Sequence, residues 1–484
     1  MLFNSYEYIL LFLPLVVLIY FGLNRLGRAD GAKVWLVLAS CFFYSYWNPV
    51  YLPILLGSIV VNYGVGTLLR TKPWDELVRR GVLIAGLAFN IGLLGYYKYA
   101  DFFISTLNGV TGSHFNLLHL LLPLGISFFT FQQIAYLVDT YRGEAREYRL
   151  LNYALFVSFF PQLVAGPIVH HREMMGQFED KANKRWISDN VARGLFIFVV
   201  GLAKKVLIAD TFGMWATYGF DTATSLTLIE GWVTSLSYSL QLYFDFSGYT
   251  DMAIGAALMF NIVLPINFFS PYKALSIQDF WRRWHMTLSR FLRDYIYIPL
   301  GGSRQSEFHT YRNTLITFLI GGLWHGAGWT FVFWGFLHGV ALVINRLWRK
   351  LGIGLPNWLS WLITFNFVNA AWVFFRAENW ADAIKVLRAM IGLNGVALPS
   401  SLADSLGWIS SLGVSFQSQL LDGQLLLALP AVLVFMTLVI TLKNSIELKD
   451  SFRAGWVNAA VTIILATASI LSLTRVSEFL YFNF

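Results

Sequence analysis

Long apolar stretches recur along almost the whole chain and constrain its fold more than any other feature. A helix needs roughly 20 mostly apolar residues to cross the hydrocarbon core of a bilayer. Of the 484 residues, 57% are hydrophobic and only 13% are charged, whereas soluble proteins carry roughly 25% charged residues. We therefore expect an all-α polytopic membrane protein that forms a single integral membrane domain over residues 1–484.

Several of the apolar segments are short or contain Gly, Pro and polar residues, so some of them are expected to be re-entrant or broken. In all, we expect roughly 11–13 transmembrane or re-entrant helices. The candidate segments are 7–24, 34–48, 51–69, 81–98, 117–138, 150–168, 191–209, 228–260, 312–325, 329–347, 357–375, 424–442 and 456–474.

Basic residues give the chain a formal net charge of +8. In a membrane protein such an excess is typical of short cytoplasmic loops, so topology accounts for it without a nucleic-acid site. Segment 150–170 lies between two basic clusters and contains Pro161 and Pro167, which favours a re-entrant turn. The clusters are Arg25/Arg28/Lys33, Arg70/Lys72/Arg79/Arg80, Arg142/Arg146/Arg149 and Lys181/Lys184/Arg185.

A further basic segment lies at the centre of the chain. On a helix, its arginines fall within an arc of about 100°, opposite an aromatic face. This pattern predicts an interfacial helix with its aromatic face in the membrane, which either anchors to anionic lipid or holds a phosphate-bearing donor or an acidic carrier. The arginines are Arg282, Arg283, Arg290 and Arg293; the opposite face holds Phe280, Trp281, Trp284, Leu288, Phe291 and Leu292.

Three histidines, His285, His325 and His338, occur in apolar surroundings. A titratable side chain in a membrane segment is costly and indicates a functional site, and a neutral imidazole accepts a proton near cellular pH. Glycines around His325 allow a neighbouring helix or a ligand to approach closely, although close helix packing alone also explains them.

Buried polar candidates also include Asp245, Ser247 and Asp251. The two carboxylates are about 120° apart on a helix, so they are expected to orient a histidine or pair with an arginine rather than share a proton. No metal site is expected, because Cys41 is the single cysteine and His170 and His171 are adjacent rather than at helical spacing. Nucleophile-elbow, phosphate-loop and dinucleotide motifs are absent from the sequence.

Six strings together resemble the membrane-bound O-acyltransferases, and within them the bacterial branch of alginate O-acetylation membrane proteins. They run in the family's order over about 160–345, within a family core of about 120–345. The strings are Gln162-Leu-Val-Ala-Gly-Pro-Ile, Phe244-Asp-Phe-Ser-Gly-Tyr-Thr-Asp-Met-Ala, Asn267-Phe-Phe-Ser-Pro-Tyr, Phe280-Trp-Arg-Arg-Trp-His-Met-Thr-Leu-Ser, Tyr297-Ile-Pro-Leu-Gly-Gly-Ser-Arg and Gly322-Leu-Trp-His-Gly-Ala.

The resemblance implies helices around a transmembrane tunnel, with His325 as the catalytic base and His285 as the second family residue. The donor, acetyl-CoA or another acyl thioester, would arrive as a substrate from the cytoplasmic side beside the basic segment. No bound cofactor is expected. The supporting or tunnel residues implied are His338, Asp245, Ser247, Asp251 and Trp324.

The expected function is a bacterial inner-membrane O-acetyltransferase that passes acetyl groups across the membrane to an exported polysaccharide such as alginate. The family also implies partners: a periplasmic serine-type, SGNH-like acetyltransferase and polysaccharide-export proteins, besides membrane lipid. Two alternatives remain open. One is D-alanyl transfer to teichoic acid with a cytoplasmic carrier protein, which gene neighbourhood would separate; the other is a transporter or flippase, which would show flux without acyl turnover.

Overall fold

The structure is a computed structural model that describes residues 1–145, 149–473 and 480. Arg146 of the third basic cluster and the last residue of segment 456–474 lie outside these residues. Within the described residues the secondary structure is helical except for one parallel pair of strands, β1 (Val396–Pro399) and β2 (Val414–Gln417). The prediction of an all-α polytopic membrane protein is confirmed.

The chain divides into two compact units. Of the described residues, unit 1 contains Met1–Leu202, Tyr249–Ile266 and those that follow Leu448, and unit 2 contains Ala203–Gly248 and Asn267–Leu448. The long helix α12 (Leu228–Met259) contributes to both.

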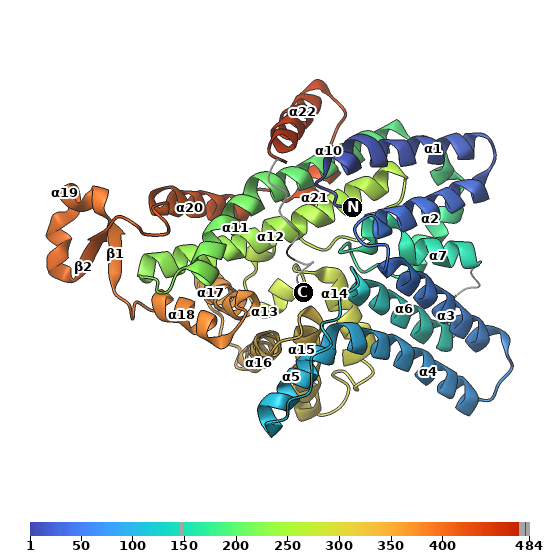
Figure 1. Ribbon diagram of the computed structural model, residues 1–484, viewed down its shortest axis with the longest axis horizontal. Coiled ribbons are helices and arrows are strands. Elements are labelled where there is room, and N and C mark those ends of the chain that lie inside the picture. Colours follow the sequence, from blue (N-terminus) through green and yellow to red (C-terminus); the bar gives the residue numbers. More distant parts are fainter. Residues whose placement is uncertain (146–148, 474–479, 481–484) are drawn as a thin grey trace. The chain divides into compact units, whose positions relative to one another are not determined.

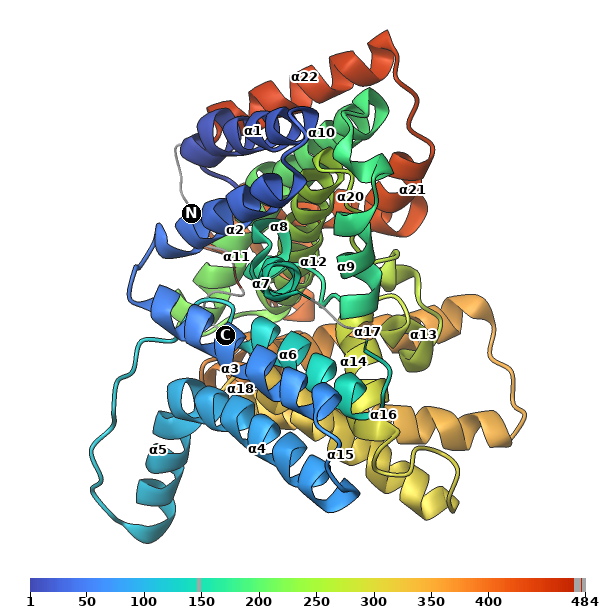
Figure 2. The same ribbon diagram turned by 90° about the vertical axis from the view of Figure 1, so that its right-hand side faces the viewer.

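In unit 1 some helices pack on their sequence neighbours, as α1 does on α2, and others on helices further along the chain, as α6 does on α3 and α4; Figure 2 shows α3, α4 and α6 side by side. Its helices are α1 (Leu13–Arg25), α2 (Ala29–Ser45), α3 (Tyr51–Thr71), α4 (Glu76–Leu94), α5 (Ala100–Thr111), α6 (Ile126–Tyr141), α7 (Leu150–Ser158), α8 (Phe160–Leu163), α9 (His171–Glu179), α10 (Ser188–Ala203) and α22 (Trp456–Leu471), with α21 (Ser445–Asp450) at its border.

Unit 2 holds the most extensive helix pair of the chain, α15 against α16, with α17 packed on α16. The strands and α19 form a small excursion next to α18 (Figure 1). Its helices are α11 (Asp210–Thr217), α13 (Ile277–Trp281), α14 (Met286–Leu292), α15 (Glu307–His325), α16 (Trp329–Lys350), α17 (Asn357–Arg376), α18 (Trp380–Met390), α19 (Ala403–Leu406) and α20 (Leu425–Thr441).

Five helices among the described residues are long and apolar enough to cross a membrane. Most other predicted segments also coincide with helices, but these are shorter or carry more polar residues. The five candidate spans are Glu7–Arg25, Tyr51–Thr71, Glu76–Thr111, Trp329–Lys350 and Asn357–Arg376.

The predicted helix over 117–138 is wrong in its first third, because α6 begins only at Ile126. The carboxylate of Asp101 accepts hydrogen bonds from the backbone N–H groups of Leu118 (2.6 Å) and His119 (2.9 Å), which holds that stretch in a loop. Gly125 then adopts a left-handed conformation, with φ 69°, directly before the helix. Apolar composition alone therefore placed the start of this helix too early.

The predicted break within 150–168 is present. Helix α7 ends at Ser158, Phe159 is non-helical, and α8 is a single turn with Pro161 in its first turn. Because proline donates no backbone hydrogen bond, it is tolerated at the start of the short α8 but not inside a continuous helix.

Candidate functional site

Two glycines bring α15 and α16 into close contact. A Cβ atom at Gly322 would collide with the carbonyl oxygen of Phe331, and one at Gly335 would collide with that of Phe318. The helices therefore approach backbone to backbone, as small residues allow in membrane proteins. This packing places His325, the last residue of α15, next to the first turns of α16.

The three predicted histidines come together in unit 2 from three separate segments. The ring centroids of His285 and His325 are 6.2 Å apart, and the indole of Trp334 lies 5.1 Å from His325 and 4.7 Å from His338. Exposed fractions are 0% for His285, 3% for His325 and 0% for His338. We call this group the histidine cluster.

Aromatic side chains surround the cluster. Trp324 lies 4.9 Å and Phe375 5.1 Å from the His325 ring, and Phe246 lies 4.8 Å from the His285 ring. Most of these contacts are edge-on, the arrangement that aromatic rings favour. The predicted supporting residue Trp324 is thus in direct ring contact with His325.

Hydrogen bonds define the tautomers of His285 and His338 in the histidine cluster. The side-chain carbonyl of Asn267 accepts from Thr287 N–H (3.1 Å) and Thr287 Oγ1 (2.7 Å), and it lies 3.3 Å from Nδ1 of His285. Since that carbonyl oxygen can only accept, Nδ1 of His285 carries the hydrogen and Nε2 holds the lone pair.

His338 has the opposite tautomer. The indole N–H of Trp281 donates to Nδ1 of His338 at 3.2 Å, and an indole nitrogen can only donate, so Nε2 of His338 carries the hydrogen. His285 thus presents a base through Nε2, and His338 presents a donor through Nε2.

The predicted continuous amphipathic helix from Arg282 to Arg293 is wrong. His285 has φ 42° and ψ 54°, a left-handed conformation that interrupts the helix between α13 and α14. The aromatic face also packs inside the protein rather than into lipid: Phe280, Trp284 and Leu288 are each 1% exposed. The break turns His285 inward, where Asn267 holds its ring.

Without a continuous helix, the four arginines no longer form one helical stripe. Arg283 pairs with Asp279 (2.9 Å) and Arg293 with Asp294 (2.7 Å), while Arg282 is exposed and Arg290 is half-buried. The segment still presents positive charge, but its acidic neighbours partly neutralise it.

Asp245 was predicted to orient a histidine or to pair with an arginine, and the structure gives it a lysine partner. Its carboxylate pairs with Nζ of Lys205 at 2.8 Å, and the same ammonium lies 2.8 Å from Asp210. Ser247 lies 3.5 Å from Nζ of Lys204. These contacts fasten α12 to the segment before α11. Asp251 is buried in unit 1, so it is not grouped with Asp245 in unit 2.

The two ends of unit 2 differ in charge. Arg346, Arg349 and Lys350 end α16, where Arg349 donates to Gln278. The positive-inside rule assigns this end to the cytoplasm. His338 lies roughly 14 Å along the helix axis from Trp329 and roughly 18 Å from Lys350, at 1.5 Å per residue. The histidine cluster therefore lies near the middle of a candidate span.

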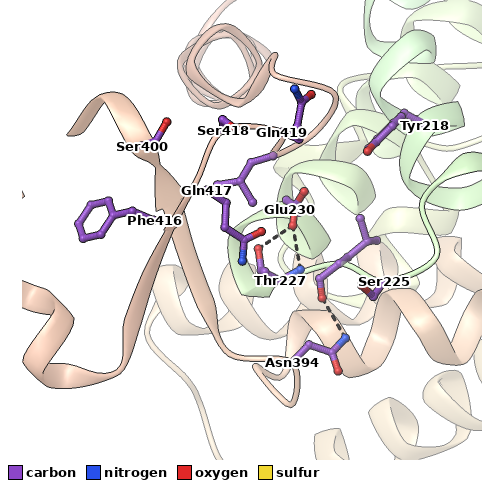
Figure 3. Close-up of a pocket in the computed structure, with 12 residues that line it drawn as sticks. Tyr218, Ser225, Thr227, Glu230, Asn394, Ser400, Phe416, Gln417, Ser418 and Gln419 are labelled. Atoms are coloured by element: carbon purple, nitrogen blue, oxygen red, sulfur yellow. Dashed lines mark hydrogen bonds between the residues drawn. The ribbon is translucent and has the colours of Figure 1, made fainter. Parts of the chain in front are cut away.

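A polar pocket lies in the opposite part of unit 2, where α17 ends and Arg376 pairs with Asp221. Glu230 is fixed inside it by Thr227 (Figure 3), and its carboxylate also accepts a hydrogen bond from the backbone N–H of Leu421. Asn394 bonds to the carbonyl of Leu226 in the same pocket. The remaining lining is rich in amides and hydroxyls, with two aromatic rings: Tyr218, Ser225, Ser400, Phe416, Gln417, Ser418, Gln419 and Leu420.

Sequence reasoning missed the roles of Asn267, Trp281 and Trp334. Asn267 and Trp281 stand inside the strings that carried the resemblance, but nothing in a string indicates that its residues contact a histidine far along the chain. Sequence reasoning also missed a second group, Asp139 with His170 and His171 in unit 1, whose ligand atoms lie within 4.8 Å of one another.

The chain is similar to several known proteins. The model of the MBOAT, membrane-bound O-acyltransferase family, matches residues 140–377. The chain is 50% identical to a peptidoglycan O-acetyltransferase of Helicobacter pylori, over 100% of the chain and 98% of that protein. It is 41% identical to a probable alginate O-acetylase AlgI of Pseudomonas aeruginosa, over 81% of the chain and 75% of that protein.

A more distant relative is a teichoic acid D-alanyltransferase of Bacillus subtilis, 28% identical over 53% of the chain and 69% of that protein. The first relative covers the chain from end to end, and the family model includes all three histidines of the cluster. The chain therefore belongs to the membrane-bound O-acyltransferase family and is a multi-pass membrane acyltransferase.

Proposed function

We propose that this membrane O-acetyltransferase takes acetyl groups from cytoplasmic acetyl-CoA and delivers them to a hydroxyl group on the other side of the membrane, with His325 as general base. The observation that carries the proposal is the meeting of His285, His325 and His338 in a buried, aromatic-walled cluster in unit 2. Buried imidazoles within a membrane protein are costly and indicate function.

The chemistry needs one proton acceptor and accurate positioning. The acceptor hydroxyl attacks the thioester carbonyl, a C–O bond forms and the C–S bond breaks. His325 takes the hydroxyl proton and returns it to the thiolate that leaves. General-base catalysis contributes about 10² to 10⁴-fold, and exclusion of water protects the thioester from hydrolysis.

His285 and His338 differ in their suitability for proton transfer. The Nε2 lone pair of His285, set by Asn267, suits it to accept a hydrogen bond from the acceptor or to relay a proton. His338 supports the aromatic wall through Trp334 and Trp281. In this proposal His325 carries the reaction, His285 assists it and His338 positions Trp334.

The basic end of unit 2 suits a negatively charged donor. Arg282 and Arg290 lie on the same short segment as His285, where Arg282 is exposed and Arg290 is half-buried. The diphosphate and 3′-phosphate groups of acetyl-CoA are the class of ligand that arginines bind well. The donor would thus enter from the cytoplasmic side beside His285.

The acceptor side favours a glycan. Amides, hydroxyls and two aromatic rings line the pocket around Glu230 (Figure 3), and sugars bind through such groups. The relative that matches the whole chain is named a peptidoglycan O-acetyltransferase, so we propose peptidoglycan as the final acceptor in place of alginate. A periplasmic SGNH-like acetyltransferase would complete the transfer, with this protein in the inner membrane.

Mass analysis of cell-wall glycan tests the proposal. A deletion strain is complemented with wild type, His325→Ala or the surface control His114→Ala, and protein levels in the membrane are measured. We expect O-acetylation to return with wild type and His114→Ala but not with His325→Ala. Full acetylation with His325→Ala at normal protein levels would refute the catalytic assignment.

Labelled donors separate the remaining alternatives. Purified protein should transfer the labelled acetyl group of acetyl-CoA to a hydroxyl acceptor. It should not use a D-alanyl carrier protein as the donor. Transport of an unmodified substrate without acyl turnover would instead favour a transporter or flippase.

A further inference from the structure

We propose that Asp139, His170 and His171 of unit 1 form a binding site for a transition-metal ion of the Zn²⁺ class. One carboxylate oxygen and two imidazole nitrogens converge from two segments that are thirty residues apart in the sequence. The site is separate from the histidine cluster and does not depend on the proposed function. The sequence had indicated no metal site, because His170 and His171 are adjacent rather than at helical spacing and Cys41 is the single cysteine.

The ligand atoms point to a common position. Nε2 of His170 lies 2.5 Å and Nε2 of His171 lies 3.0 Å from the same oxygen, Oδ2 of Asp139. Zn²⁺ binds imidazole nitrogen and carboxylate oxygen at about 2.0–2.2 Å, so ligand atoms around it are roughly 3.3 Å apart. Shifts of less than about 1 Å in these side chains would open this space.

Burial favours a defined site over a surface contact. The side chain of Asp139 is 2% exposed and that of His171 is 0% exposed, whereas that of His170 is 22% exposed. His171 also packs edge-on against the ring of Tyr136, with centroids 6.0 Å apart, which limits its rotation. The partly exposed His170 leaves a path for the ion and for a water molecule as a fourth ligand.

The charges nearby are compatible with a cation. Arg142 approaches Asp139 at 4.0 Å through Oδ1, whereas the two imidazoles contact Oδ2. Arg172 is paired with Glu144 at 2.5 Å. One carboxylate and two neutral imidazoles would leave a net charge of about +1 on a divalent ion, as in other sites with two histidines and one carboxylate.

Proton balance follows from the hydrogen bonds. Nδ1 of His170 accepts a long 3.4 Å bond from the backbone N–H of Arg172, so its hydrogen is on Nε2 and faces Asp139. Nε2 of His171 likewise carries a hydrogen that faces Oδ2 of Asp139. The ion would replace both hydrogens, and each neutral imidazole would then carry its hydrogen on Nδ1, in His170 at the expense of the long bond. Such an ion would fasten the C-terminal turn of α6 to the start of α9.

Metal analysis tests the site. The full-length protein is purified in detergent with a tag that lacks histidine, dialysed against metal-free buffer, loaded with Zn²⁺ and dialysed again. We expect wild type to retain Zn²⁺ in a fixed ratio to protein. His170→Ala and Asp139→Asn should each weaken binding more than about tenfold, because even outer-shell changes weaken metal sites by 10 to 100-fold. His114→Ala, at an exposed histidine, should bind like wild type.

Two further measurements keep the result decisive if a variant folds poorly. Bound Co²⁺ should give ligand-field absorption in wild type and His114→Ala but not in His170→Ala. A chelator should lower the unfolding temperature of Zn²⁺-loaded wild type but not that of His170→Ala. Equal Zn²⁺ content in wild type and His170→Ala, or no chelator effect on wild type, would overturn the site in favour of a metal-free hydrogen-bonded group.

Discussion

Two groups of buried histidines in this protein contrast in the side chains that surround them. In the histidine cluster of unit 2, His285, His325 and His338 contact indole and phenyl rings, an amide and one another. In unit 1, His170 and His171 both face the carboxylate of Asp139. A carboxylate holds an imidazole or a cation in place, whereas neutral, apolar surroundings leave the lone pair of an imidazole available for a substrate proton.

The surroundings of the unit 2 cluster therefore suit a chemical reaction, whereas those of the unit 1 group suit a contact that holds two helices together. The unit 2 cluster lies near the middle of a candidate span, where an acyl group could pass from one side to the other. The unit 1 group ties the end of α6 to the start of α9. Substitutions in the two groups should accordingly produce different kinds of loss.

The largest effect is expected for His325→Gln, which removes the proposed base while it keeps a polar side chain of similar length. Acetyl transfer by purified protein should fall by about 10² to 10⁴-fold, the usual contribution of a general base. Labelled acetyl-CoA turnover measures the loss, and thermal unfolding controls for the fold. If the variant retained more than about a tenth of the wild-type rate, His325 would not be the general base, because an activity that survives loss of the base does not depend on it.

Asp139→Ala should act mainly on stability. It removes the shared acceptor of the buried His171 and the partly exposed His170, which costs about 1–3 kcal/mol of the free energy of unfolding. Thermal or denaturant unfolding in detergent measures the change, with Asp30→Ala, at an exposed carboxylate, as the matched control. Equal stability of the two variants would show that the unit 1 group does not hold α6 to α9.

Asn267→Ala tests whether the orientation of His285 matters. Loss of the amide carbonyl frees the His285 ring to take either tautomer, so acetyl transfer should fall on the order of tenfold. The variant Asn267→Asp, which keeps an oxygen acceptor at the same position, should recover part of that rate. If both variants lost activity equally, the carbonyl would have no positioning role.

The smallest effect is expected for Trp281→Phe, which keeps an aromatic ring but removes the N–H group that donates to His338. One lost hydrogen bond should lower the free energy of unfolding by about 1 kcal/mol, with a change in acetyl transfer of less than about tenfold. Parallel unfolding and turnover measurements check both values. A loss of activity as large as that of His325→Gln would give His338 a direct part in the reaction.

Much of the helical framework could be predicted from sequence. Candidate segments such as 329–347 and 357–375 coincide with α16 and α17, because runs of apolar residues of that length fold as helices in a membrane. The error at 117–138 arose where Asp101 binds the backbone of a distant loop, a contact that apolar composition does not reveal.

The site was predictable in its residues but not in its geometry. His325, His285 and His338 stood out as costly polar groups in apolar surroundings. The helix break at His285 was not predictable, since the sequence from Phe280 to Arg293 has an unbroken amphipathic period. The pairing of Asp245 with Lys205 was also missed, because the expected partner of that carboxylate was a histidine or an arginine and nothing in the sequence pattern indicates which residues of different helices meet.

The sequence by itself determined a polytopic helical membrane protein of the O-acyltransferase family. It also determined which histidines stand in apolar surroundings. These features can be recognised from sequence because hydrophobicity and motifs are properties of short continuous stretches of the chain. Only the tertiary structure decided which of those groups meet. Close contact of α15 and α16 at two glycines places His325 beside Trp334, and packing of α9 on the end of α6 places two adjacent histidines on one carboxylate. Such contacts join residues far apart in the chain, and their geometry depends on how whole helices pack.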